Sequence, residues 1–235
     1  MKNRLSKVLA ACGVASRRAC ETLIFDGNVS VNGVVVKVPQ TLVDLPKDEV
    51  RVFGNLIKSP ESKVYYLLHK PTGYICSSKK VNSKKIVLDL FEGLPYRLFT
   101  VGRLDRETSG LLIVTNDGHF ANQVIHPSAE IAKEYLVKTT HEITQSHLEQ
   151  ISEGALVEGV WVKPKKVQKI RKGTLKIILM EGKKREVRTL VEKAGLEILS
   201  LARIRIGGLH LGSIPYGSFR EMTANDKKQL LQKSS

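Results

Sequence analysis

The residues best suited to chemistry lie in one polar loop, where a single carboxylate stands among cations. Asp105 lies between Arg103 and Arg106, in a short stretch bounded by Gly102 and Gly110. Nearby positive charge favours the anionic form of a carboxylate. A carboxylate on a loop at the end of a strand is a candidate nucleophile or general base. From position alone, a surface aspartate in a salt-bridged turn explains the same residues, since exposed ion pairs are common and weak.

A strand and a turn are expected directly after this loop. Residues 111–115 are apolar or β-branched, which favours a buried β-strand. Asn116, Asp117 and Gly118 then favour a turn. The carboxylate would therefore face outward from the end of a buried strand.

The composition indicates a globular protein with a polyanionic partner. The chain has 235 residues, of which 42% are hydrophobic and 26% charged, so it has room for one large domain or for a small and a medium one. The net charge of +15 makes RNA or DNA the first candidate partner and a membrane surface the second. No apolar run approaches the roughly 20 residues of a membrane-spanning helix, so we expect no integral membrane protein.

The cysteines and histidines predict neither a disulfide framework nor a metal site. The three cysteines, at 12, 20 and 76, form no C-x-x-C pair, and the six histidines have no metal-ligand spacing. Phosphate-binding and dinucleotide-binding glycine loops are also missing from the sequence. We therefore expect no cofactor and no essential metal. The N-terminus lacks the apolar core of a signal peptide, so we expect a soluble protein in the reducing cytoplasm.

The first 58 residues are expected to form a small domain of two helices and a hairpin. Apolar residues at helical spacing predict helices over about 4–11 and 17–26, the second capped by Ser16. Asn32-Gly33 between β-branched residues predicts a two-residue hairpin turn. The Gly-, Ser- and Pro-containing residues 54–62 then favour a linker.

Residues 63–235 are expected to form a second, larger domain with an α+β fold. Strands and helices alternate irregularly, which favours a mixed, mainly antiparallel sheet with helices. The predicted strands are 64–69, 98–101, 111–115, 135–139, 175–180 and 199–206, and the predicted helices are 117–126, 144–153, 184–195 and 223–232.

A basic segment within this domain predicts phosphate contacts. Residues 163–188 hold eleven Lys or Arg against only Glu181 and Glu186, a net charge of +9. Such a cluster can neutralise several phosphates but carries little sequence information by itself. Lys183, Lys184 and Arg185 are expected to open an amphipathic helix, where cations oppose the helix dipole unless anions lie nearby.

The wording of residues 102–118, Gly-Arg-Leu-Asp…Thr-Ser-Gly-Leu-Leu…Thr-Asn-Asp-Gly, resembles the pseudouridine synthases, in particular the branch that modifies ribosomal RNA. The resemblance implies that Asp105 is the catalytic aspartate and that Arg103 fills the gap left by a flipped-out base. Residues 133–137 resemble the family's tyrosine-bearing strand, which implies that Tyr135 stacks on the target base.

Two further segments resemble motifs of the same family. Residues 181–190 resemble the third motif, in which the arginine at the position of Arg188 pairs with the catalytic aspartate. Glu186 stands where many members have Gln, and Thr189-Leu190 where they have Arg-Met. Residues 69–74 resemble the first motif, which shapes the pocket, and Lys70 within it is a candidate substrate contact.

The N-terminal segment resembles the RNA-binding domain first seen in ribosomal small-subunit protein four. The order Arg-Leu-Ser-Lys-Val-Leu…Ser-Arg-Arg…Asp-Gly-Asn-Val-Ser-Val-Asn-Gly carries this resemblance over residues 1–55. It implies that Arg4, Lys7, Arg17 and Arg18 contact RNA phosphates.

Together these resemblances imply an isomerase that converts uridine to pseudouridine in ribosomal RNA as a monomer. The Thr-Asn-Asp-Gly and Arg-Glu-Val-Arg wordings favour a large-subunit over a small-subunit target. A non-catalytic RNA-binding or ribosome-assembly factor would explain the charge and the first domain, but it would not explain why Asp105, Tyr135 and Arg188 all lie in matching motifs. A helix-turn-helix DNA binder is disfavoured by the Asn-Gly hairpin.

Overall fold

A computed structural model of the chain describes residues 2–57, 59–79 and 83–232. Lys58, which belongs to the expected linker, and residues 1 and 233–235 lie outside the described residues. The chain divides into two compact units, Met1–Val64 with Leu94–Arg97, and Tyr65–Gly93 with Leu98–Ser235. The sequence pattern did not predict that residues 94–97 would belong with the first unit.

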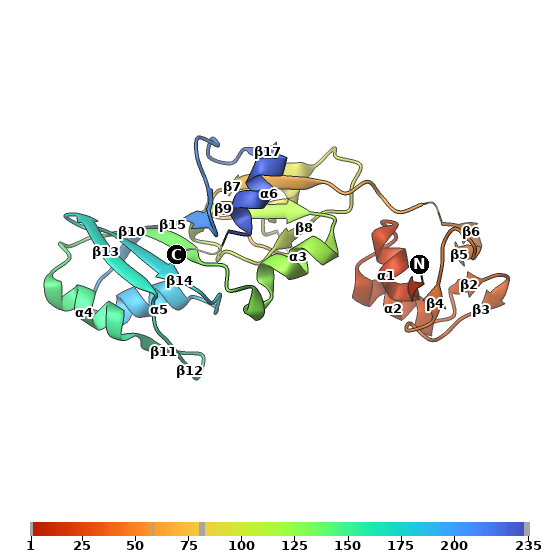
Figure 1. Cartoon of the computed structure of the whole chain (residues 1–235), viewed down its shortest axis with the longest axis horizontal. Helices are drawn as coiled ribbons and strands as arrows, with labels where there is room; N and C mark the ends of the chain where they lie inside the picture. The colour runs from red at the N-terminus through yellow and green to blue at the C-terminus, as the bar shows by residue number, and fades with distance from the viewer. Residues whose placement is uncertain (1, 58, 80–82, 233–235) are drawn as a thin grey trace. The chain divides into compact units, whose positions relative to one another are not determined.

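The first unit combines two helices with short antiparallel strands (Figure 1). Its elements are α1 (Leu5–Ala11), α2 (Arg17–Phe25), β1 (Asn3–Arg4), β2 (Val29–Val31), β3 (Val34–Val35), β4 (Leu42–Val43), β5 (Val50–Val52) and β6 (Asn55–Leu56). Ser16 caps α2 as expected, accepting a hydrogen bond from the Ala19 amide at 3.2 Å. Asn32 and Gly33 turn the β2–β3 hairpin at positive φ. β6 lies within the expected linker. The sequence did not predict it, because it is stabilised by pairing with β5 rather than by a local pattern.

The second unit is a nine-stranded mixed sheet, counted over the described residues, with helices beside it. This architecture confirms the expected α+β class. The strands are β7 (Tyr65–Lys70), β8 (Phe99–Val101), β9 (Thr108–Thr115), β10 (Lys133–Thr139), β13 (Lys166–Arg171), β14 (Thr174–Leu179), β15 (Ile198–Ile206), β16 (Leu209–His210) and β17 (Phe219–Glu221). The helices are α3 (Gly118–Ile125), α4 (Gln145–Glu153), α5 (Glu186–Lys193), α6 (Ala224–Leu230) and two short 3-10 helices, η1 (Val87–Phe91) and η2 (Pro127–Ala129).

The strand order of this sheet is β13-β14-β10-β15-β9-β7-β17, with β8 paired to β9 and β16 to β15. In Figure 1, α4 and α5 lie along the half formed by β10, β13 and β14, whereas α3 and α6 lie beside the other half. A separate hairpin, β11 (Ala155–Val157) with β12 (Val160–Val162), packs through β11 against α5. Neither this hairpin nor β13 was predicted from the sequence.

The central strand β9 is buried along nearly its whole length, as its apolar sequence predicts. Leu111 and Ile113 on β9 pack with Leu67 of β7 and with Phe120 and Val124 of α3 in one apolar cluster. Asp117 caps α3, its side chain accepting from the amide of residue 119 at 3.0 Å. The strand and its helix therefore hold the loop before β9 on a rigid base.

One pair of neighbouring strands in the sheet, β9 and β15, is parallel, and it sets the position of the loop that carries Asp105. β9 begins at Thr108, earlier than expected, so Gly110 lies inside the strand instead of bounding the loop. Gly110 has φ of +109°, and a Cβ there would come within 2.2 Å of the Arg203 carbonyl oxygen on β15. Only glycine permits this close approach of the two backbones.

Replacing Gly110 by Ala tests this constraint. We expect Gly110→Ala to lower the free energy of unfolding by about 3 kcal/mol or more, because the new methyl group meets backbone atoms that cannot move aside. Gly54→Ala is the matched control, since Gly54 also has positive φ but nothing lies within 4 Å of the added Cβ. Urea unfolding of both variants measures the difference. Equal losses for the two variants would contradict the packing argument.

Candidate active site

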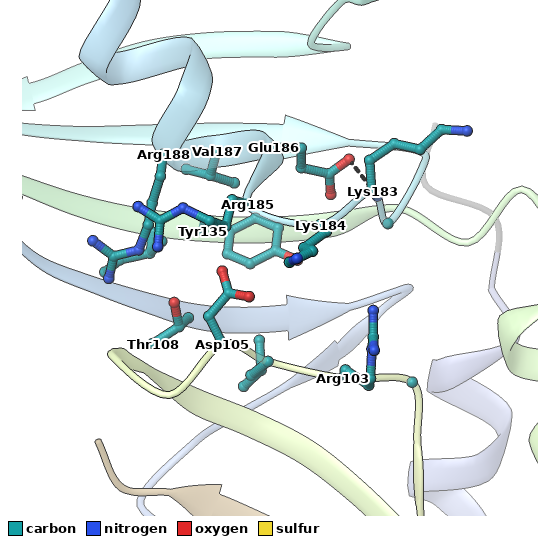
Figure 2. Close-up of a pocket in the computed structure, with 14 residues that line it drawn as sticks. Arg103, Asp105, Thr108, Tyr135, Lys183, Lys184, Arg185, Glu186, Val187 and Arg188 are labelled. Carbon is teal, nitrogen blue, oxygen red and sulfur yellow. Dashed lines mark hydrogen bonds between the residues drawn. The ribbon is translucent and has the colours of Figure 1, made fainter. Parts of the chain in front are cut away.

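One pocket gathers the residues that the sequence singled out. It has a volume of about 170 Å³, several times the roughly 30 Å³ that one water occupies in the liquid. Its walls come from the Asp105 loop, from Tyr135 on β10, from residues 182–188 at the start of α5, and from Leu201 on β15. In Figure 2 the Asp105 carboxylate points toward the Tyr135 ring, with Arg188 to one side.

The backbone of the Asp105 loop is held by hydrogen bonds from Lys70, the last residue of β7. The Lys70 ammonium donates to the carbonyl oxygens of Pro71, Asp105 and Thr108 at 3.1, 3.0 and 2.9 Å. The Thr108 amide in turn donates to the Asp105 carbonyl at 3.1 Å. These bonds fix the backbone on both sides of the carboxylate, while the half-buried Asp105 side chain stays at the pocket.

The assignment of Lys70 as a substrate contact is therefore wrong. Its side chain is 0% exposed, and its three donors are used by carbonyl groups. Burial lowers the pKa of Lys70, and the nearby Asp105 carboxylate opposes that shift. Lys70 is a part of the scaffold that positions Asp105, because a buried ammonium with satisfied hydrogen bonds cannot reach RNA.

Tyr135 forms the wall opposite Asp105. It is 6% exposed and lies directly across from Arg203 on β15, on the same face of the sheet. Burial raises the pKa of Tyr135, and the positive charge of Arg203 partly offsets that rise. The hydroxyl thus stays protonated at neutral pH, which suits a stacking surface or a hydrogen-bond donor better than a base.

Arg188 lines the same pocket but does not form the expected ion pair with Asp105 in this structure. Among the ion pairs of the described residues, none joins these two side chains. Arg188 Nη2 instead donates to the Glu107 carbonyl at 3.1 Å. Its Nε is buried and has no hydrogen-bond partner in the described part of the chain. One donor of Arg188 is therefore unused in the pocket wall.

The basic loop, which we define as Lys183, Lys184 and Arg185, lies exposed at the rim of the pocket. The expectation that these cations open a helix is wrong, because α5 begins only at Glu186. Arg185 has left-handed backbone geometry, with φ of 55°, and so ends the loop rather than continuing into the helix. Arg103 is also exposed at this rim.

Glu186 is the buried acid of the pocket. It is 3% exposed, and its carboxylate accepts a hydrogen bond from the Lys183 amide at 2.9 Å, which fastens the basic loop to α5. Burial raises the pKa of Glu186 to about 7, although the Lys183 hydrogen bond and the charge of Lys133 lower it in part. Near neutral pH this residue can thus be an uncharged acid.

Sequence reasoning missed two residues of the site, Arg203 and Thr108. The Arg203 guanidinium is buried beside Tyr135 and donates through Nε to the Leu111 carbonyl at 2.9 Å, while Nη2 has no partner in the described chain. The Thr108 hydroxyl lines the pocket and is also unsatisfied there. An arginine inside the apolar run 199–206 was the available signal for Arg203, since a buried charge in a strand requires a reason.

The four cations expected to contact RNA in the first unit are all exposed. Arg4 precedes α1, Lys7 lies on it, and Arg17 and Arg18 open α2. Arg17 also approaches Glu21 at 3.5 Å, one turn along the same helix. Exposure leaves these side chains accessible to a polyanion.

The described residues contain no cluster of three or more potential metal ligands. Over the same part of the chain, no helix has both the length and the apolar character that crossing a membrane requires.

Comparison with known proteins identifies the class. Residues 64–193 match the family model of RNA pseudouridylate synthase, and residues 3–50 match the S4 domain. A crystal structure titled as a pseudouridylate synthase superposes with a TM-score of 0.69 at 27% identity, covering 97% of this chain and 99% of that one. The chain belongs to the RNA pseudouridylate synthase family.

Two relatives carry more specific names. Ribosomal large subunit pseudouridine synthase B of Bacillus subtilis is 37% identical, over 97% of this chain and 95% of its own length. A chloroplast protein of Arabidopsis thaliana, provisionally named a ribosomal large subunit pseudouridine synthase, is 48% identical over 97% of this chain. This chain spans 60% of the length of that chloroplast protein.

Removing the buried charge of Glu186 tests the description of the pocket. Between about pH 4.5 and 7 the folded state binds the Glu186 proton more tightly than the unfolded state, so the free energy of unfolding falls as pH rises. Gln cannot ionise, so Glu186→Gln should gain stability over wild type as pH rises, by up to about 3 kcal/mol at pH 8 and little at pH 5. Urea unfolding at both pH values measures this gap.

The exposed Glu181→Gln is the matched control and should show no such gap. A Glu186→Gln advantage equal at pH 5 and pH 8 would contradict the buried, uncharged acid.

Proposed function

We propose that this chain isomerises uridine to pseudouridine within ribosomal RNA, and that its target lies in the large subunit. The observation that carries the proposal is one pocket that holds the Asp105 carboxylate against the Tyr135 ring, beneath a rim of exposed cations. The names of the Bacillus and Arabidopsis relatives support the choice of the large subunit.

The reaction rearranges one nucleoside and needs no external reactant. The bond between uracil N1 and ribose C1′ breaks, the uracil turns in place, and a bond forms between C5 and C1′. C5 loses its proton and N1 gains one, so atoms and electrons balance. The pocket must therefore hold a detached base beside its sugar and keep bulk water away from both.

The target base must leave its stack to reach the pocket. Extrusion costs a few kcal/mol, which stacking on Tyr135 and phosphate contacts to the basic loop would offset. Arg103, exposed at the rim, would occupy the space that the base leaves in the RNA. Leu201 and Val187 supply apolar surface to the lining of the pocket.

Asp105 would act on the ribose. Its carboxylate either attacks C1′ as a nucleophile or removes a ribose proton, and both routes place it against the sugar rather than against the uracil. Arg188 has an unused donor in the pocket wall. We propose that Arg188 turns to the Asp105 carboxylate when RNA fills the pocket, because hydrogen bonds of a catalytic site often tighten only in the complex.

The two units would divide the work. The unit matched by the S4 domain would capture RNA through Arg4, Lys7, Arg17 and Arg18, and the second unit would perform the chemistry. The expected limits of these domains are 1–58 and 63–235. We propose that the protein acts as a monomer on rRNA or an assembly intermediate in the cytoplasm.

Removing the charge of Asp105 tests the chemistry. Asp105→Asn should lower the rate of pseudouridine formation by about 10⁴-fold or more, because the amide can neither attack nor accept the proton. RNA affinity should change by less than about threefold, since the side chain makes no phosphate contact. Because uridine and pseudouridine have the same mass, product is measured by digesting the treated large-subunit rRNA to nucleosides and separating the two isomers by chromatography.

Glu107→Gln, an exposed acid of the same loop, is the matched control and should retain activity. Substantial product from Asp105→Asn would refute the assignment.

Neutralising the first unit's cations tests the division of labour. Replacing Arg4, Lys7, Arg17 and Arg18 by Gln should weaken rRNA binding and reduce the slope of log affinity against log salt by about 3. The single-turnover rate at saturating rRNA should stay within about twofold. Lys37→Gln with Lys47→Gln is the control, and a collapse of the single-turnover rate in the fourfold variant would contradict the proposal.

A further inference from the structure

The β11–β12 hairpin presents an aromatic side chain to solvent. Leu156 and Trp161 lie directly opposite each other across the two strands and are 51% and 61% exposed. Their neighbours Ala155, Val157 and Val162 are buried on the other face. One face of the hairpin therefore packs against the protein, and the other exposes a pair of large apolar side chains. Core packing does not explain this exposed pair.

The indole of Trp161 lies close to the backbone at Gly154. A Cβ at Gly154 would lie 3.0 Å from Trp161 Nε1 and 2.4 Å from the Val162 carbonyl oxygen. Gly154 also has φ of +99°, which a side chain would oppose. The absence of a side chain at Gly154 thus lets the indole pack against the backbone. A ring packed in this way loses little conformational entropy when a ligand binds to its exposed face.

Two cations follow the hairpin directly. Lys163 and Lys165 are exposed, whereas Val162 before them and Pro164 between them are buried. Exposed and buried residues therefore alternate from Trp161 to Lys165, and the exposed ones are the tryptophan and the two lysines. Glu158 is the only acid between residues 154 and 180, which include seven Lys or Arg. The apolar pair therefore stands in a strongly positive environment.

We propose that this surface, the hairpin face of Leu156, Trp161, Lys163 and Lys165, binds unpaired nucleotides of the RNA substrate. A base stacks on the indole, and the adjoining phosphates approach the two lysines. Stacking of a base on an aromatic side chain contributes without regard to sequence, and the lysines favour a polyanion over an apolar protein surface. The proposal rests on RNA being the substrate, as in the proposed function, but not on the chemistry at Asp105.

Trp161 is the only tryptophan of the chain, so fluorescence excited at a wavelength that the six tyrosines do not absorb reports on the hairpin face alone. Titrating the full-length protein with a single-stranded oligouridylate of about 12 nucleotides should quench the emission to saturation. An RNA duplex of the same length should quench it less, because its bases are already stacked. Unchanged emission at RNA concentrations where fluorescence anisotropy of a labelled oligouridylate shows saturation would overturn the proposal.

Substitutions separate stacking from folding. Trp161→Ala should weaken oligouridylate binding about 5- to 150-fold, whereas Trp161→Phe should stay within about threefold of wild type. Leu199→Ala, which shortens an exposed apolar side chain elsewhere in the second unit, is the matched control. Circular dichroism and thermal unfolding confirm that each variant is folded. Wild-type affinity in a folded Trp161→Ala variant would overturn the proposal.

The outcome is independent of the proposed reaction. If wild-type protein forms no pseudouridine but oligouridylate still quenches Trp161, the proposed function fails and the hairpin face stands. If Trp161→Ala binds normally and the protein forms pseudouridine, the function stands and the hairpin face fails. A fluorescence response to ribosomal proteins and none to RNA would assign the surface to a protein partner and also overturn the proposal.

Discussion

The geometry of the candidate active site depends on one buried cation, the ammonium group of Lys70. Taking such a charge out of water is costly unless its hydrogen bonds are made, and here three carbonyl oxygens accept from it. Two of those carbonyls belong to Asp105 and Thr108, so the end of β7, the loop and the start of β9 are joined at one atom. The backbone at Asp105 is thus held in place, although it lies on a loop.

The parallel pairing of β9 with β15 connects the Asp105 loop to the opposite wall of the pocket, which Tyr135 forms. The glycine at position 110 lets the two backbones approach closely, and β15 in turn pairs with β10, which carries Tyr135. Three adjacent strands thus set the distance between the carboxylate and the ring. The remaining wall comes from the start of α5, where the Glu186 carboxylate accepts from the Lys183 amide and Arg185 approaches Glu192 at 3.6 Å. The side of the pocket that carries Asp105 and Tyr135 is therefore built on paired strands, whereas the side that would meet RNA is an exposed loop joined to α5.

Much of this arrangement could be predicted from the sequence, and the failures share a physical cause. The pattern of residues 102–118 indicated the loop and the strand, and local signals placed the cap of α2 and the turn before α3. What the sequence did not predict depends on contacts between distant segments. The Lys70 ammonium is buried because it donates to carbonyl groups that lie 35 and 38 residues further along the chain. β13 is an edge strand exposed on both faces, so its sequence lacks an alternating pattern. Arg188 was expected to pair with Asp105, but its guanidinium is bound to the Glu107 carbonyl.

The central claim is that Asp105 meets the ribose of an extruded uridine whose base lies on Tyr135. A crystal structure of the Asp105→Asn variant with a fragment of the large-subunit rRNA that the wild type modifies would test it most directly. We expect the target uridine outside its stack, its ring against Tyr135 and its C1′ within contact distance of residue 105. An RNA bound with every base stacked and the pocket empty would contradict it.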